Sequence, residues 1–168
     1  MTTLCIVGNG ADKFTPRTRV LAILAIANAI AEWRPTVVIS GESPVGGIDE
    51  WARKTARLAG VAFEPYAPNV DRWDGEQQAG PNKIGFKQRN QMMADACDIA
   101  VSIVVGAYPD TYEGRRWKGC YHCNRAARKD SEFAVGWHVK SGACWTLLRA
   151  REKGSLVQWV IINEGGTT

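Results

Sequence analysis

Short apolar, β-branched runs alternate with amphipathic stretches along most of the chain. The runs, which are typical of strands buried in a parallel sheet, lie at 3–7, 37–39, 61–63, 99–105 and 156–162. Apolar residues recur at helical spacing between them, at 16–34, 48–60, 84–97 and 144–153. This alternation predicts an α/β fold in which helices cover both faces of a parallel sheet. A length of 168 residues is typical of one domain, so we expect residues 1–168 to form a single unit.

The segment from Thr36 to Gly60 combines a strand, a glycine-containing loop and a helix. Gly46 and Gly47 directly precede the predicted helix, which begins near Ile48 and ends at Gly60. A helix N-terminus offers unpaired N–H groups and a partial positive charge, and glycines let a ligand approach the backbone. These features favour an anion-binding site, and an ordinary strand–helix turn without a ligand is the alternative.

A second tight turn, Gly8-Asn9-Gly10, follows the first predicted strand. A standard dinucleotide site would require glycine where Lys13 stands, and an acidic residue at the end of the second strand. Glu32 lies instead at the end of a predicted helix. We therefore exclude a standard NAD site and expect Gly8 and Asn9 to line a pocket at the carboxyl edge of the sheet.

Three segments lack a clear period. Residues 64–82 are rich in proline and glycine and contain Trp73, and a loop of this length is commonly functional. Residues 106–141 form a basic insertion rich in Cys, His, Trp and Gly, and residues 164–168 are expected to be a loose tail.

The insertion carries most of the candidate metal ligands. Cys120, Cys123, His138 and Cys144 have the spacing of a Cys₃His zinc site, in which two close thiolates and a distant pair bind one ion. His122 is an alternative to His138 as the fourth ligand. Zinc would be structural here, because it would order a polar insertion that lacks a core of its own. Scattered thiols with a surface histidine are the competing interpretation.

Composition narrows the class of protein. The formal net charge is +4, and part of the excess lies near Arg115, Arg116 and Lys118, which favours an anionic ligand or a solvated surface over a general nucleic-acid binder. Five cysteines argue against a disulfide framework. Because the chain begins with a predicted strand and no apolar run is long enough to span a bilayer, we expect a cytoplasmic protein without a membrane partner.

Several of these motifs occur together in a known order. They are Ile39-Ser40-Gly41, the run from Gly46 to Ala52, Pro68 with Trp73, Arg89-Asn90, and the run from Ser141 and Gly142 to Thr146. In this the chain resembles the SLOG superfamily, which includes the LOG phosphoribohydrolases and the DNA-processing protein A family. The resemblance implies a Rossmann-like sheet that binds a nucleotide or nucleotide-derived molecule at its carboxyl edge, and it implies a homodimer. The expected ligand-binding residues are Gly8, Asn9, Ser40, Gly41, Gly46, Gly47, Asp49, Trp73, Arg89, Asn90, Ser141, Gly142 and Thr146.

Enzymatic activity carries over from this resemblance less well than the fold. Arg149 stands where the LOG enzymes have their catalytic glutamate, and Asn90 replaces a lysine of their first motif. Glu42 and Asp49 are then the candidate catalytic acids, because a carboxylate can stabilise an oxocarbenium-like state. Asp49 has a simpler explanation too, since acids in a first helical turn interact favourably with the helix dipole.

Three functions are compatible with this sequence. The first is binding of a nucleotide-like small molecule by a sensor, a sequestering protein or an enzyme. The second is cleavage or transfer of an N-glycosidic bond in nucleotides, and the third is binding of single-stranded nucleic acid. Trp73 and Trp145 lie in or beside the loops expected to rim the pocket and can stack on a base. Trp117 and Trp137 either do the same or form a local core in the insertion.

Overall fold

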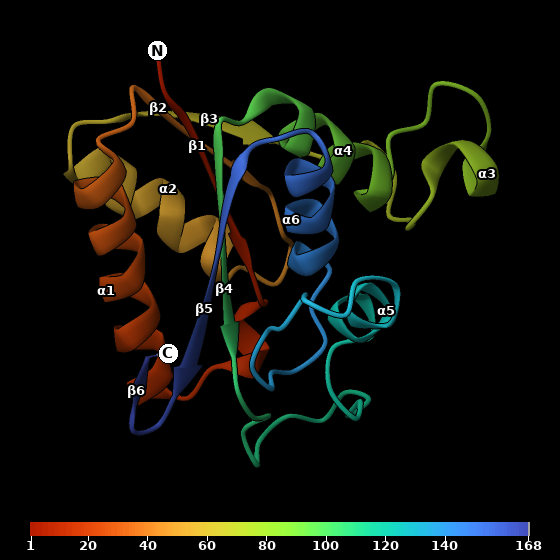
Figure 1. The fold of residues 1–168 in the computed structure, drawn as a ribbon. Helices are drawn as coiled ribbons and strands as arrows, with labels where there is room; N and C mark the ends of the chain where they lie inside the picture. Colours follow the sequence, from red (N-terminus) through yellow and green to blue (C-terminus); the bar gives the residue numbers. More distant parts are fainter. Residues whose placement is uncertain (168) are drawn as a thin grey trace.

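A computed structural model describes residues 1–167 and shows a six-stranded sheet in the order β3-β2-β1-β4-β5-β6 (Figure 1). The strands are β1 (Thr3–Gly8), β2 (Val37–Gly41), β3 (Ala62–Tyr66), β4 (Ile99–Val105), β5 (Leu156–Asn163) and β6 (Gly166–Thr167). The first five strands are parallel, and β6 pairs antiparallel with β5. The strand order reverses between β1 and β4, and ligands bind at the carboxyl ends of such a pair in open α/β sheets.

Helices cover both faces of the sheet, which confirms the predicted fold class (Figure 1). They are η1 (Ala11–Lys13), α1 (Pro16–Trp33), α2 (Ile48–Leu58), α3 (Gly75–Ala79), α4 (Phe86–Ala96), α5 (Tyr121–Lys129) and α6 (Ala143–Glu152). Helices α1 and α2 lie on one face, α4 and α6 lie on the other, and α5 packs against α6.

The central strands contribute side chains to both layers of the core. In β1, Leu4 and Ile6 pack with α1 and α2, while the alternate residues Cys5 and Val7 pack with α4 and α6. All residues of β4 are buried. This explains the continuous apolar run in the sequence, because a central parallel strand has no solvent-facing side.

Local signals account for the helix boundaries that were predicted well. Thr15 caps α1 by accepting a hydrogen bond from the Thr18 N–H, and Pro16 occupies the first turn, where its missing N–H costs nothing. Helix α2 ends just before Gly60, which has a φ of 70°, a left-handed conformation that favours glycine.

The segments expected to be irregular contain more structure than the sequence indicated. Strand β3 continues to Tyr66, and Asp74 caps the short helix α3 by accepting from the Gln77 N–H. The insertion contains α5, and the tail forms β6 instead of a loose end. Both elements are short and contain few large apolar residues, so their order comes from packing against neighbours. None of the helices in the described part of the chain is long and apolar enough to cross a membrane.

Candidate functional site

A cavity of about 210 Å³ opens at the carboxyl edge of the sheet, where β1 ends and the loops after β2 and before α6 meet. We call this cavity the cup. It is lined by most of the predicted ligand residues, namely Gly8, Asn9, Gly46, Asp49, Trp73, Arg89, Asn90, Gly142 and Thr146. The two glycine turns, at Gly46 and at Gly142, therefore meet at one rim although they lie far apart in the sequence.

The other predicted ligand residues lie just behind this lining. Ser40 is fully buried and supports Asp49 from behind, with its Oγ 3.2 Å from Asp49 Oδ1. Gly47 caps α2 with a φ of 94°, and a Cβ there would lie 2.5 Å from the Asn9 carbonyl oxygen. Ser141 is buried next to Gly142 and accepts a hydrogen bond from the Ala143 N–H.

A buried ion pair forms the polar floor of the cup. Arg89 Nη1 lies 3.5 Å from Asp49 Oδ2, and both side chains are about one-tenth exposed. Burial raises the pKa of Asp49, and the charge of Arg89 and the hydrogen bond with Ser40 oppose that rise. Gly41 makes room for the pair, because a Cβ at this position would overlap Arg89 Nη1.

Two buried polar atoms of residues that line the cup have no hydrogen-bond partner among residues 1–167. They are Arg89 Nε and Thr146 Oγ1. Buried polar groups are normally hydrogen-bonded, since an unpaired one costs roughly 1–3 kcal/mol. Both atoms can donate a hydrogen bond, so a ligand with acceptor oxygens would satisfy them.

Two wider hollows adjoin the cup on opposite sides. One, of about 470 Å³, carries Glu42, Glu50 and Arg53, so Glu42 lies beside the cup and not in it. The other, of about 800 Å³, is bordered by Trp73 and Gly142 of the cup and by side chains of α5 and α6. Sequence analysis did not predict this second hollow, because it did not predict α5.

Asn9 ties the cup to the insertion. Its Oδ1 accepts from the Val105 N–H at 3.0 Å, and its Nδ2 donates to the Lys140 carbonyl at 3.3 Å. The side chain is buried, so these bonds are shielded from water. The end of β1, the end of β4 and the segment before α6 are thereby held at one place.

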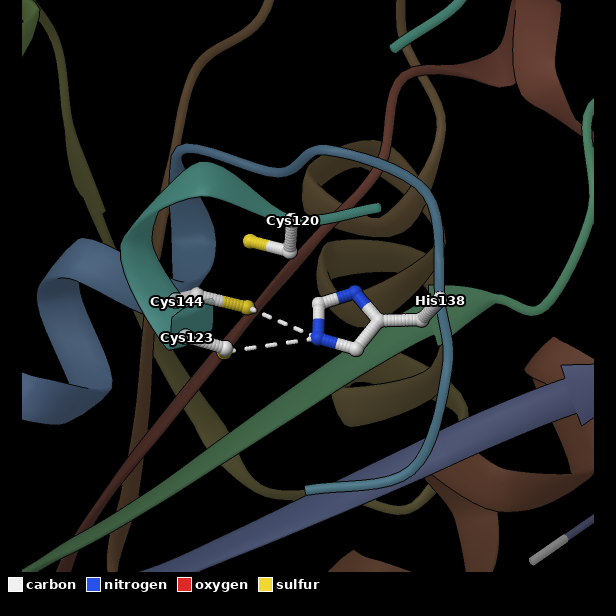
Figure 2. Close-up of side chains that lie close together, drawn as sticks. All are labelled: Cys120, Cys123, His138 and Cys144. Atoms are coloured by element: carbon white, nitrogen blue, oxygen red, sulfur yellow. Dashed lines mark hydrogen bonds between the residues drawn. The ribbon is translucent and has the colours of Figure 1, made fainter. Parts of the chain in front are cut away.

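A second cluster lies on the same side of the sheet as α6. The metal-binding atoms of Cys120, Cys123, His138 and Cys144 lie within 4.8 Å of one another, and all four residues are buried (Figure 2). Cys120 caps α5 and Cys123 lies in its first turn, while Cys144 lies in the first turn of α6. This arrangement can hold a metal ion.

The hydrogen bonds of His138 favour metal binding by Nε2. Its Nδ1 lies 2.8 Å from the Val139 carbonyl oxygen and donates to it, while Nε2 faces Cys123 and Cys144 at 3.4 and 3.8 Å (Figure 2). A carbonyl that fixes the orientation of a ligating ring is common around metal ions. His122 lines the wider hollow instead, so the fourth member of the cluster is His138.

The three cysteine thiols of the cluster shift one another's pKa values. Hydrogen bonds from Cys123 and Cys144 hold the pKa of Cys120 well below its usual range. The contact with Cys120 raises the pKa of Cys123 to about 12. A negative charge is therefore favoured on one of the three thiols, and thiolates are the form in which cysteine binds metals.

Comparison with protein-family models gives no match, and comparison with curated protein sequences gives none either. Solved structures do resemble this chain. The molybdenum cofactor carrier protein from Chlamydomonas reinhardtii aligns with a TM-score of 0.52 and 15% identity over 94% of this chain and 75% of its own. This likeness shows the Rossmann-like fold that the resemblance to the SLOG superfamily predicts.

Two further solved structures align with this chain at lower similarity. The protein TM1055 aligns with a TM-score of 0.45 and 19% identity over 62% of this chain and 61% of its own. The DNA processing protein A from Streptococcus pneumoniae aligns with a TM-score of 0.43 and 15% identity over 94% of this chain and 58% of its own.

The substitution Gly41→Ala tests how the ion pair is positioned. Because the new Cβ would overlap Arg89 Nη1, we expect Arg89 to move and the free energy of unfolding to fall by about 1–3 kcal/mol. Urea denaturation measures the change. Gly165→Ala is the control, since a Cβ there meets no atom within 4 Å, and it should change stability by less than about 0.5 kcal/mol. Equal stability of the two variants would contradict this account of Gly41.

Proposed function

We propose that the protein binds a nucleotide or a nucleotide-derived small molecule in the cup. The observation that carries this proposal is the pair of unpartnered buried donors, Arg89 Nε and Thr146 Oγ1, beside two glycine turns. A phosphate or ribose offers the acceptor oxygens that such donors need, and the partial positive charge at a helix start favours an anion. The fold similarity to a cofactor carrier protein is consistent with small-molecule binding.

The size of the cup limits which part of the ligand it holds. Sites for drug-sized molecules usually measure roughly 300–1,000 Å³. At about 210 Å³ the cup is smaller, so it suits a phosphate and sugar and leaves the base to an adjoining hollow.

Thr146→Val tests the cup, because valine keeps the shape of threonine and removes the hydroxyl. We expect nucleoside monophosphates to bind the wild-type protein, and the variant to bind them roughly tenfold or more weakly, the usual effect of losing a hydrogen bond to a charged group. Isothermal titration calorimetry measures both affinities. Thr55→Val is the control, since Thr55 lies on α2 outside the cup. If neither protein binds a nucleotide, or both variants bind as the wild type does, the proposal fails.

A second candidate function is hydrolysis of the N-glycosidic bond of a nucleotide. The position of Asp49 in the cup supports it, because burial raises the pKa of this carboxyl group, and its protonated form can donate a proton to the departing base. Water then adds to the sugar carbon and returns a proton to the carboxylate. Arg149 stands at the position of the catalytic glutamate of the LOG enzymes, so the mechanism would differ from that of those enzymes.

Release of free base from nucleoside monophosphates tests this second function. The pKa of Asp49 is raised in the folded protein. Activity that needs the protonated form of Asp49 should therefore be present at acidic pH and decline as the pH rises through that pKa. Asp49→Asn should abolish base release, and Glu42→Gln, in the adjoining hollow, should retain it. Chromatography detects the base. Binding of nucleotide without any base release would leave the binding function alone.

We further propose that the ion held by Cys120, Cys123, His138 and Cys144 is zinc in a structural role. Three sulfurs and one imidazole are a common ligand set for structural zinc, and four protein ligands leave no open position for water. The ion would hold α5 against α6 in an insertion with few apolar residues of its own.

Metal analysis of protein purified without added metal tests the assignment. We expect about one zinc ion per chain, and we expect Cys144→Ser to lose it and to unfold at a lower temperature. Cys97→Ser is the control, because Cys97 is a buried cysteine outside the cluster and should leave the zinc content unchanged. Zinc far below one per chain in the wild-type protein, or another metal in its place, would refute the assignment.

A further inference from the structure

The wider hollow beside the cup has the composition of a binding site. We call it the groove. It measures about 800 Å³ and is lined by the aromatic residues Trp73, Tyr121, His122 and Trp145, and by basic residues of α5, α6 and the segment before α6. Trp73 and Gly142 line both the cup and the groove, so the two spaces are neighbours. Trp73 and Gly142 thus form the boundary across which a ligand in the cup would reach the groove.

Two aromatic rings of the groove are separated by nearly the distance that a planar base needs to insert between them. The ring centroids of Trp73 and His122 lie 6.3 Å apart, with 30° between the ring planes. Rings that stack directly in this protein are closer, as in the pair Tyr108 and Tyr112 at 4.7 Å. A planar ring between two others needs about 7 Å in total, twice the usual contact distance of carbon atoms. A small movement of Trp73, which is 41% exposed, would admit a base.

Other aromatic side chains hold these two rings from the side. Trp145 meets Trp73 edge-on at 6.1 Å, and Tyr121 meets His122 edge-on at 5.5 Å. The aromatic surface is therefore continuous from α6 to α5. Base–aromatic stacking is tolerant of base identity, so such a surface suits nucleotides in general.

The charge of the groove fits an anion. Arg125 and Lys129 on α5, Lys140 and Arg149 line it, and Glu152 is the one acidic residue among the residues that line it. Arg149 is paired with Glu152 at 3.0 Å, and Lys140 lies over the Trp117 ring. Of the cations that line the groove, this leaves Arg125 and Lys129 exposed and without such a contact. The other hollow beside the cup carries Glu42, Asp49 and Glu50 against Arg53 alone, so its charge favours a negative ligand less than that of the groove.

We propose that the groove binds a second nucleotide unit, so that the ligand is a dinucleotide in which a phosphate bridge joins two nucleotides. The proposal rests on the proposed function of the cup, which would hold the phosphate and sugar of the first unit, while the base of that unit would lie in the hollow that carries Glu42. The base of the second unit stacks beside Trp73, and its phosphate faces Arg125. The same chemistry is available in a free dinucleotide and at the end of a single strand.

Two aromatic residues of the groove are neighbours in sequence of the metal cluster. Tyr121 and His122 lie in sequence between Cys120 and Cys123, and both cysteines belong to the buried cluster. Binding of one ion by these cysteines fixes the first turn of α5 and hence the position of both aromatic residues. The insertion thus supplies one wall of a binding site in addition to its own structure.

Calorimetric titration of the zinc-containing protein with AMP and with the dinucleotide pApA tests the proposal. We expect pApA to bind about tenfold more tightly than AMP or better, since one stacked base alone contributes at least about fivefold. Tyr121→Ala and Arg125→Ala should each remove most of this advantage and leave the affinity for AMP unchanged. Tyr121→Phe keeps the ring, and Arg128→Ala removes a charge of α5 outside the groove, so both controls should retain the advantage.

The outcomes separate failure of the groove from failure of the cup. Equal affinities for AMP and pApA would overturn the proposal for the groove, and so would an advantage of pApA that survives Tyr121→Ala and Arg125→Ala. Either result would leave the proposal for the cup intact. Binding of neither compound would overturn both proposals. If the advantage is present, a longer single strand identifies its source: tighter binding than pApA indicates the end of a strand, and equal binding indicates a free dinucleotide.

Discussion

The buried ion pair between Arg89 and Asp49 is the constraint on which the cup depends. An arginine taken out of water must be paired, and breaking a buried pair commonly costs about 3–5 kcal/mol. The chain meets this demand with a glycine at position 41, a serine behind Asp49 and a helix that carries Arg89 to the edge of the sheet. The pair also leaves one guanidinium N–H without a partner. The stability of this edge and its capacity for a ligand therefore come from the same residues.

The topology explains why residues so far apart in sequence form one site. The strand order reverses between β1 and β4, so the connections from these strands run to opposite faces and leave a crevice between them. Asn9 spans that crevice from the end of β1 to Val105 and Lys140. The Cys and His cluster then fastens α5 to the first turn of α6. One amide and four metal-binding side chains thus position an insertion that has little apolar core.

The parts predicted from sequence are those with a strong local signal. The run from Ile99 to Val105 is apolar throughout and proved to be a central strand, and the spacing of Cys120, Cys123, His138 and Cys144 was enough to group them. The choice between His122 and His138 needed coordinates, because it depends on which ring faces the sulfurs. The same holds for α5 and β6, which are stabilised by their neighbours. The placement of Gly46 beside Gly142 follows from topology, which composition does not encode.

The two edges of the sheet are both poor templates for another strand. Strand β3 forms one edge, and its Pro65 has no N–H that could donate a hydrogen bond to an added strand. At the opposite edge the long β5 is partly covered by β6, which is only two residues long. Lateral growth of the sheet into fibrils is thereby disfavoured. Any association between copies of this chain would have to use helices or loops, and the sheet itself would stay the same width in a monomer and in an assembly.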